Sequence, residues 1–170
     1  MIRIILHVDM ECGIGKKNDL MFHLPKDMAF FRNTTKGHVV VMGENTLLSF
    51  PGSKPLKNRT NIVLSADPTH NYEGCINLHT MDDLHKKMRE IDESGEDVYV
   101  IGGASIYRAL LPYSDEALIT KVDAVGGADV FFPNLDSDPS FECVYESEKE
   151  QDEDAYITFT RYINKNKLPL

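Results

Sequence analysis

The sequence predicts an α/β fold built on a largely parallel, twisted sheet. Short apolar runs rich in β-branched residues recur as far as residue 101, and helical patterns lie between several of them. Such runs are typical of strands that are buried on both faces. Strands that alternate with helices form parallel sheets with right-handed crossovers. The predicted buried strands are 2–8, 38–42, 61–65, 75–79 and 98–101.

Two helices follow from apolar spacing in the second half of this region. Met81, Leu84, Met88 and Ile91 recur at helical spacing, with acidic and basic residues on the opposite face. A second helix is predicted over 104–111, where the following proline ends it.

The last third of the chain predicts strands without helices between them. The segments are 116–121, 141–148 and 155–163, and the last alternates in period 2, which is typical of an antiparallel strand. There is no internal repeat or linker, so one domain is expected over 1–163, followed by a loose C-terminal tail at 164–170.

Composition and charge exclude several classes of protein. The 170 residues carry 18 basic and 27 acidic side chains, a net charge of −9, which argues against nucleic acid or an anionic membrane as a partner. The acidic residues between 136 and 154 are interpreted as a solvated surface. No apolar run reaches membrane-spanning length. The three cysteines lie far apart, as in a cytoplasmic protein with reduced thiols.

One acid stands alone on the apolar face of the first predicted helix. Pro25 suits the first helical position, because its missing N–H does no harm there. Leu24, Asp27, Met28 and Phe31 then fall on one face. A buried carboxylate is costly unless a cation or hydrogen-bond donors meet it. Asp27 is therefore a candidate recognition acid for a small ligand with an amidine-like pair of N–H donors.

Three glycine-containing turns follow predicted strands. The 13–15 turn is a weak signal, and its spacing is not that of a Rossmann fingerprint. Gly102 and Gly103 run directly into a helix, whose N-terminus suits a phosphate, although a plain turn explains the pattern equally well. Gly43 marks a second strand–helix junction. Two such junctions on one parallel sheet favour a dinucleotide lying across its carboxyl edge.

Three further polar side chains have structural as well as functional interpretations. Thr120 ends a late strand, where its hydroxyl fits either a half-buried strand position or a partner for a buried acid. Arg59 precedes a buried strand and is suited to a carboxylate, although a lone loop arginine is usually a surface residue. His7 lies within an apolar strand and fits a core histidine better than a catalytic one. No nucleophilic triad or zinc spacing is present, so no metal is expected.

Taken together, these segments resemble the dihydrofolate reductase family. The resemblance covers most of the chain, and the order and gaps of its motifs are specific. After the Gly-Ile-Gly turn, the motifs are LPxD at 24–27, MGxxT at 42–46, PLxxRxNxxLS at 55–65, IGG…Y…LP at 101–112, LTxI at 118–123 and DxxFP at 129–133. The resemblance implies a mostly parallel twisted sheet of about eight strands, an antiparallel C-terminal strand and about four flanking helices.

The resemblance also implies a reaction, the NADPH-dependent reduction of 7,8-dihydrofolate to 5,6,7,8-tetrahydrofolate for one-carbon metabolism. Hydride passes to pterin C6, and a solvent-derived proton is added at N5. Asp27 is expected to bind the pterin 2-amino group and N3, with support from Thr120, and Phe22 takes the place of a family tryptophan. Arg59 is expected to bind the glutamate α-carboxylate.

The other implied site residues form a substrate pocket and a cofactor groove, and the loop over 14–24 is expected to close over the nicotinamide. The implied substrate contacts, besides Arg59, are His7, Met28, Phe31, Phe50, Leu56 and Ile101. The implied cofactor contacts are Ile14, Gly15, Asp19, Gly43, Glu44, Asn45, Thr46, Leu64, Ser65, Ala66, Gly102, Gly103, Ala104, Ser105, Ile106 and Tyr107.

The chain departs from the family at three places. Met21 and Phe22 replace a Pro-Trp pair, and Phe22 has no N–H to donate to the ordered water that the indole usually holds. Leu6 and His7 replace a pair of small residues, which puts a larger side chain near the nicotinamide and pterin. Glu44 stands where the family commonly has Arg or Lys to bind the 2′-phosphate of NADPH.

The change at Glu44 bears on cofactor choice. A carboxylate repels a phosphate, and an acid at this position favours a free ribose hydroxyl. Asn45 and Ala66 also replace typical partners of that phosphate. The sequence therefore predicts weaker discrimination against NADH, unless His79 or Lys57 supplies compensating positive charge. The changed pocket also raises the hypothesis of altered antifolate sensitivity.

Three other interpretations stay open from the sequence. The pyrimidine reductase of riboflavin synthesis shares the fold but lacks the LPxD helix with its acid. A non-catalytic folate- or nucleotide-binding relative is compatible with Phe22 and Glu44. A purely structural domain is disfavoured by Asp27, which has no obvious internal partner. The expected protein is a monomer that binds dihydrofolate and antifolates, with no nucleic acid or membrane partner.

Overall fold

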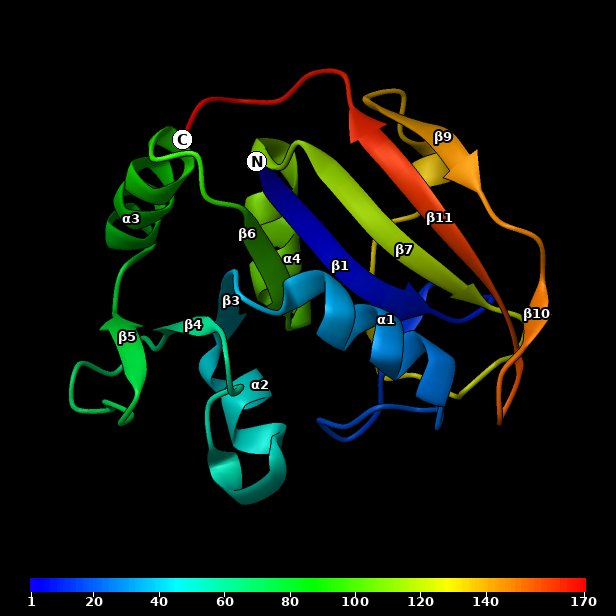
Figure 1. Cartoon of the computed structure of the whole chain (residues 1–170), viewed down its shortest axis with the longest axis horizontal. Helices are drawn as coiled ribbons and strands as arrows, with labels where there is room; N and C mark the ends of the chain where they lie inside the picture. Colours follow the sequence, from blue (N-terminus) through cyan, green and yellow to red (C-terminus); the bar gives the residue numbers. More distant parts are fainter.

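Apolar, β-branched runs form the centre of one twisted sheet in the computed structural model, which describes residues 1–170 (Figure 1). Six of its strands are β1 (Ile2–Val8), β3 (Val39–Gly43), β4 (Thr60–Leu64), β5 (Cys75–Leu78), β6 (Val98–Gly102) and β7 (Glu116–Val122). In the order β7-β1-β6-β3-β4-β5 all neighbouring pairs are parallel. The carboxyl ends of these strands therefore meet at one edge of the sheet.

The last third of the chain adds antiparallel strands beside β7, as its period-2 pattern predicts. They are β9 (Phe141–Glu146), β10 (Glu150–Gln151) and β11 (Tyr156–Asn164). β11 pairs with β7 on one side and with β9 and β10 on the other. The sheet thus has nine strands, and β2 (Gly13–Gly15) pairs with β8 (Val130–Phe131) in a separate small sheet.

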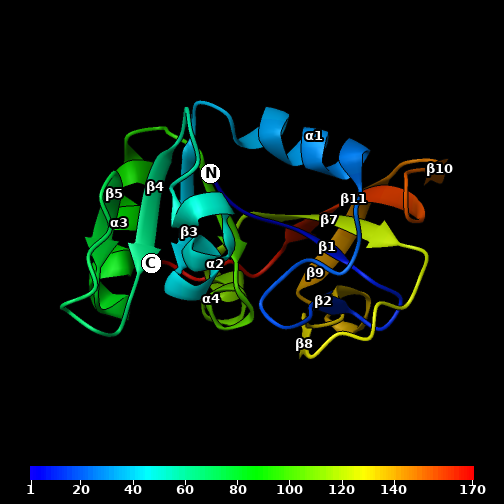
Figure 2. The same cartoon turned by 90° about the horizontal axis from the view of Figure 1, so that it is seen from below.

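Four helices cover the two faces of the sheet, which confirms the predicted number. They are α1 (Pro25–Thr35), α2 (Glu44–Ser49), α3 (Met81–Glu93) and α4 (Ala104–Leu110). On one face, Leu84 of α3 and Leu110 of α4 belong to a cluster of 21 buried residues. On the other, Leu47 of α2 belongs to a cluster of six, against which Phe31 of α1 packs. Figure 2 shows α1 and α4 on opposite sides of the sheet.

Short 3₁₀ turns complete the fold at Pro51–Ser53, Leu111–Tyr113 and Leu135–Ser137. None of the helices combines the length and the apolar character that crossing a membrane requires.

The sequence predicts a loose tail over 164–170, but Asn164 ends β11 and residues 165–170 lie against the rest of the domain. The Lys165 N–H donates to the Ser140 carbonyl at 2.7 Å, and the Leu168 N–H donates to the Pro112 carbonyl at 2.9 Å. These acceptors are distant in sequence, so no local pattern in the tail indicates them.

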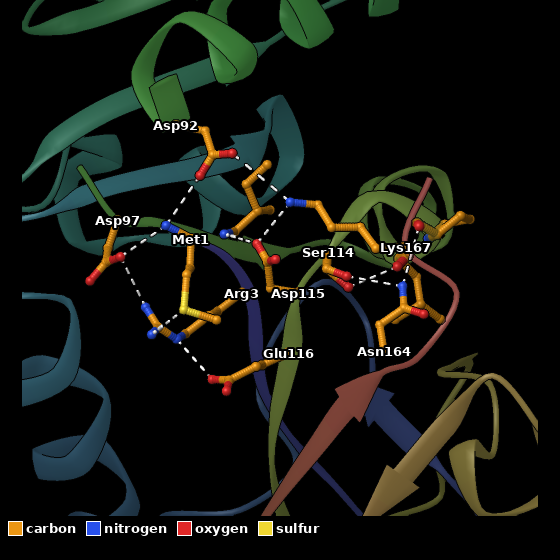
Figure 3. Close-up of polar contacts among 12 residues, drawn as sticks. Met1, Arg3, Asp92, Asp97, Ser114, Asp115, Glu116, Asn164 and Lys167 are labelled. Atoms are coloured by element: carbon orange, nitrogen blue, oxygen red, sulfur yellow. Dashed lines mark hydrogen bonds and ion pairs between the residues drawn. The ribbon is translucent and has the colours of Figure 1, made fainter. Parts of the chain in front are cut away.

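A polar network joins this tail to the N-terminus (Figure 3). Lys167 Nζ lies 3.0 Å from Asp115 and 3.9 Å from Asp92. The N-terminal ammonium of Met1 lies 3.2 Å from Asp92 and 3.1 Å from Asp97. Each pair is partly exposed and contributes little alone, but shared carboxylates link both chain ends to the sheet.

The acidic stretch between residues 136 and 154 is not merely a solvated surface. Asp152 is only 4% exposed, and its carboxylate accepts the backbone N–H groups of Lys26 and Asp27, each at 3.1 Å. No side chain caps α1 from its own N-cap residue, Leu24. Asp152 therefore satisfies the free N–H groups of the first helical turn from the far end of the chain.

Replacing Asp152 tests this remote cap. We expect Asp152→Ala to lower the free energy of unfolding by about 2 kcal/mol, because several backbone N–H groups lose a charged acceptor. Urea denaturation followed by circular dichroism measures the change. Glu153→Ala is the control, because the Glu153 side chain makes only an exposed contact with His23 at 3.4 Å. Equal stability of the two variants contradicts the cap.

Candidate active site

Asp27 lies at the start of α1, on the side of the helix that faces the sheet. It is 9% exposed, and Leu24 before it is 1% exposed. The buried face of α1 is narrower than the sequence predicts, because Met28 is 45% exposed and Phe31 is only half-buried. The acid is thus enclosed, while Met28 borders open space.

The carboxylate of Asp27 has an internal partner, which the sequence did not reveal. His7 Nδ1 lies 3.1 Å from Asp27 Oδ2, and both side chains are buried. Thr120 is opposite His7 in the β1–β7 register and is also buried. The side-chain hydrogen bond to Asp27 is made by His7, and Thr120 makes none with it.

An apolar wall continues from Asp27 along the same face of the sheet. Its base is the cluster of six buried hydrophobic residues that includes Ile5, Val40 and Met42. Side chains from α1, from the segment after α2 and from β6 pack against this cluster. Those that the sequence predicts as substrate contacts are Phe31, Phe50, Leu56 and Ile101.

Arg59 lies at the end of this wall. Its Nη1 donates to Thr35 Oγ1 at 3.2 Å, and its Nε donates to the Lys57 carbonyl at 3.0 Å. Burial and the neighbouring Arg32 lower the pKa of Arg59 from its ordinary value. Two adjacent guanidinium groups with spare donors suit an anionic group, and a carboxylate is the anion that arginine binds bidentately.

The two predicted strand–helix junctions lie side by side. β3 and β6 are neighbours, with Met42 opposite Gly102, and the Gly102–Gly103 peptide is cis. A Cβ atom on Gly102 would lie 3.2 Å from Thr46 Oγ1, and one on Gly43 would lie 3.1 Å from Ile106. The absence of side chains at both glycines lets the junctions approach closely.

Comparison with known proteins decides the family. A family model described as dihydrofolate reductase matches residues 1–165. A dihydrofolate reductase of Bacillus subtilis (strain 168) is 38% identical over 136 residues, covering 80% of this chain and 77% of its own. One of Staphylococcus haemolyticus is 33% identical over 137 residues, covering 81% and 79%. The chain belongs to the dihydrofolate reductase family.

A solved structure supports the same assignment. Dihydrofolate reductase from Enterococcus faecalis, complexed with NADP(H) and RAB-propyl, matches with a TM-score of 0.86 at 28% identity, and 96% of each chain is covered. These findings confirm the predicted fold and the predicted oxidoreductase activity of the family, NADPH-dependent reduction of dihydrofolate. The pyrimidine reductase and the non-catalytic relative are correspondingly disfavoured.

Glu44 of this dihydrofolate reductase has a histidine neighbour that the sequence did not identify. His70 Nδ1 lies 3.0 Å from Glu44 Oε2, whereas His79 contacts the Ser65 carbonyl at 2.8 Å. The Ser65 hydroxyl, with His70 and Tyr72, lowers the pKa of Glu44. The histidine that contacts Glu44 is therefore His70, while His79 is bound to the backbone of Ser65. His70 lies in a polar loop without a pattern that marks it.

The remaining predicted cofactor residues lie at different depths. Tyr107 is buried and donates to the Ile5 carbonyl at 2.9 Å, and burial raises its pKa, so its hydroxyl is used within the core. The others divide into buried Gly15 and Ser65, half-buried Ile14, Leu64 and Ala104, and exposed Asp19, Asn45, Ala66 and Ser105.

The loop after β2 reaches the β3–α2 junction. Asn18 Nδ2 donates to the Asn45 carbonyl at 3.1 Å, across 27 positions of sequence. The Lys17 N–H donates to Asp129 at 2.9 Å, which fixes the loop to the segment before β8. Phe22, near the end of the loop, has its ring centroid 6.3 Å from that of His7. The loop therefore links the β3–α2 junction to the surroundings of His7 and Asp27.

Asp9 anchors the start of this loop and was not predicted. It is 4% exposed, and its carboxylate accepts the N–H groups of Glu11, Gly13 and Gly126 at 2.8, 2.7 and 3.0 Å. Burial raises the pKa of Asp9, but these hydrogen bonds outweigh burial and lower it. An acid directly after a buried strand and before a glycine turn was the available signal.

The lowered pKa of Asp9 gives a pH-dependent prediction. A carboxylate whose pKa falls on folding stabilises the protein above its unfolded pKa of about 3.9 and loses that contribution as pH falls through the folded value. We expect Asp9→Asn to be less stable by about 1–3 kcal/mol at neutral pH, because the amide cannot accept from Gly126 and Gly13 together.

Urea denaturation at neutral and acidic pH measures this difference, which shrinks below the unfolded pKa. Glu11→Gln is the control, because it removes a neighbouring exposed charge that accepts no backbone N–H. A difference between wild type and Asp9→Asn that is constant with pH contradicts the assignment.

Proposed function

We propose that this enzyme reduces 7,8-dihydrofolate to 5,6,7,8-tetrahydrofolate with NADPH, and that Asp27 binds the pterin ring. The observation that carries the proposal is the position of the Asp27 carboxylate. It is nearly buried, it lies at the start of an apolar wall, and it is bonded to β1 of the sheet on which the two glycine junctions lie.

Asp27 suits the nitrogen-rich edge of a pterin. A carboxylate has about four lone-pair sites, and His7 uses one of them at Oδ2. The remaining sites accept the pterin N3–H and 2-amino group as two parallel hydrogen bonds. Phe31, Phe50 and Ile101 then enclose the rings, and burial of apolar ring surface adds to the affinity.

The far end of the substrate is negatively charged and fits Arg59. Its guanidinium keeps donors beyond those bound to Thr35 and Lys57, and Arg32 adds a second positive charge. Leu56, beside the apolar wall, and the exposed Met28 border the path between Asp27 and Arg59. The site thus has a carboxylate at one end for the pterin and a guanidinium cation at the other for the glutamate carboxylate.

The residues of the cofactor groove fit a dinucleotide. Gly43 and Gly102 leave little room for a Cβ, and without side chains there the backbone can come close to a ligand that lies across this edge. No side chain caps α4, which leaves the N–H groups of Ala104 and Ser105 free for a phosphate. When bound, NADPH supplies the hydride that pterin C6 receives.

The protein's part in the reaction is orientation, electrostatics and exclusion of water. Asp27 orients the pterin and favours its protonated form, while the proton at N5 comes from solvent. Phe22 has no donor to hold a water molecule, so it contributes only apolar surface. The loop over 14–24, tied to Asn45 through Asn18, covers the reacting rings.

The setting proposed for the enzyme is the cytoplasm, where it acts as a monomer on dihydrofolate and is inhibited by antifolates. Cys12, Cys75 and Cys143 are all unpaired, which favours a reducing compartment. The net charge of −9 disfavours nucleic acid and anionic membranes as partners.

Substitution of Asp27 tests the proposed substrate site. We expect Asp27→Asn to lower kcat/KM for dihydrofolate by about 10²–10³-fold, because an amide presents one acceptor and no charge. Steady-state loss of NADPH absorbance measures the rate, and fluorescence titration with methotrexate measures occupancy of the pocket. The control is Asp82→Asn, the same change at an exposed acid of α3. Unchanged turnover and unchanged methotrexate affinity in Asp27→Asn contradict the proposal.

Substitution of Glu44 tests cofactor choice. We propose that Glu44 weakens discrimination between NADPH and NADH, because its charge repels a 2′-phosphate. Glu44→Arg replaces a repulsion of about 1 kcal/mol between the side chain and the 2′-phosphate with an attraction of similar size. We therefore expect the preference for NADPH over NADH to rise about 30-fold.

The ratio of kcat/KM values for the two cofactors measures this effect. Glu93→Arg, with the same charge change on an exposed position of α3, is the control. A strong NADPH preference in wild type that Glu44→Arg leaves unchanged shows the idea to be wrong.

A further inference from the structure

The two nitrogens of His7 have different surroundings. Nδ1 lies 3.1 Å from Asp27 Oδ2, whereas Nε2 is fully buried and has no hydrogen-bond partner in the protein. The residue is 9% exposed, on a strand whose backbone is fixed by pairing with β7. The ring is therefore held in place, with one directed contact to the substrate acid.

That contact determines where the ring carries its proton. A carboxylate only accepts hydrogen bonds, so Nδ1 must be the donor. Phe22, whose ring centroid lies 6.3 Å from that of His7, is apolar and offers nothing to Nε2. The Nδ1–H tautomer is thus selected by Asp27 alone.

The two oxygens of Asp27 also differ. Oδ2 is bound to His7, while Oδ1 makes no hydrogen bond and is not fully buried. The χ2 torsion of aspartate has no sharp intrinsic preference, so only an external hydrogen bond fixes the plane of the carboxylate. His7 supplies that bond from the closed side and leaves Oδ1 accessible.

We propose that His7 is a positioning residue for the reaction: it donates from Nδ1 to Asp27 and fixes the carboxylate plane that receives the substrate. This inference rests on the proposed role of Asp27 in binding the pterin. A planar pair of N–H donors needs both oxygens in its own plane, so free rotation of the carboxylate lowers the share of productive complexes.

Two substitutions of His7 separate the hydrogen bond from the volume of the ring. His7→Phe keeps an aromatic ring but has no donor, and we expect kcat/KM for dihydrofolate to fall about tenfold. His7→Asn places an amide N–H close to the position of Nδ1, and we expect kcat/KM within about threefold of wild type. A purely structural role predicts the reverse order, because phenylalanine preserves the packing better. Thermal unfolding of both variants, followed by circular dichroism, reports that packing separately.

Nitrogen NMR of the ligand-free enzyme tests the hydrogen bond without any turnover. In protein labelled with ¹⁵N-histidine, the His7 signals are assigned by their loss in His7→Phe. We expect a protonated Nδ1 and an unprotonated Nε2, and we expect loss of this tautomer preference in Asp27→Leu, which removes the acceptor.

The outcomes distinguish this inference from the proposed function. An Nε2–H tautomer, or a His7→Asn enzyme no more active than His7→Phe, overturns the positioning role. A wild-type enzyme without dihydrofolate reduction overturns the proposed function instead. In that case two other measurements still decide whether His7 positions Asp27. They are the tautomer of His7 and the methotrexate dissociation constants of the two variants, which the positioning role predicts to be lower for His7→Asn than for His7→Phe.

Discussion

Burial of the Asp27 carboxylate is the constraint on which the rest of the site depends. An ionised acid at this depth is tolerated only when donors meet it. Here the backbone N–H of Asp27 is bound by Asp152, near the end of the chain, and its side chain is bound by His7 of the first strand. The helix that presents the acid is thus held between β1 and the segment before β11, and its position over the sheet is fixed before any ligand enters.

The parallel sheet supplies the second half of the site by a separate principle. Strands that run the same way end at the same edge, so β3 and β6 bring two glycine junctions together without any direct attraction between them. Gly43 and Gly102 then let the backbone approach Ile106 and Thr46 closely. The acid is placed by hydrogen bonds, whereas the two glycine junctions are placed by the topology of the sheet.

The sequence predicted the parallel strands within one residue of their bounds, because continuous apolar runs and helical spacing are local signals. It predicted Asp27 because a charge on an apolar face is also local. It missed His70 beside Glu44, the Asp152 cap and the tail contacts. Those interactions join residues that are far apart in the chain, and a loop histidine or one acid among many carries no pattern. His7 was considered, but its partner depended on how α1 crosses β1.

The acidic composition has a structural use that net charge does not reveal. Asp9 and Asp152 are buried and bind backbone N–H groups of distant segments, and Asp115 accepts the N–H of Ile2 at 2.8 Å. Each carboxylate satisfies donors where a strand or helix begins or a loop turns back. Asp9 accepts the N–H of Gly13 at the start of the loop that ends at Leu24, and Asp152 accepts the N–H of Lys26 just beyond its end, so buried acids hold both ends of that loop.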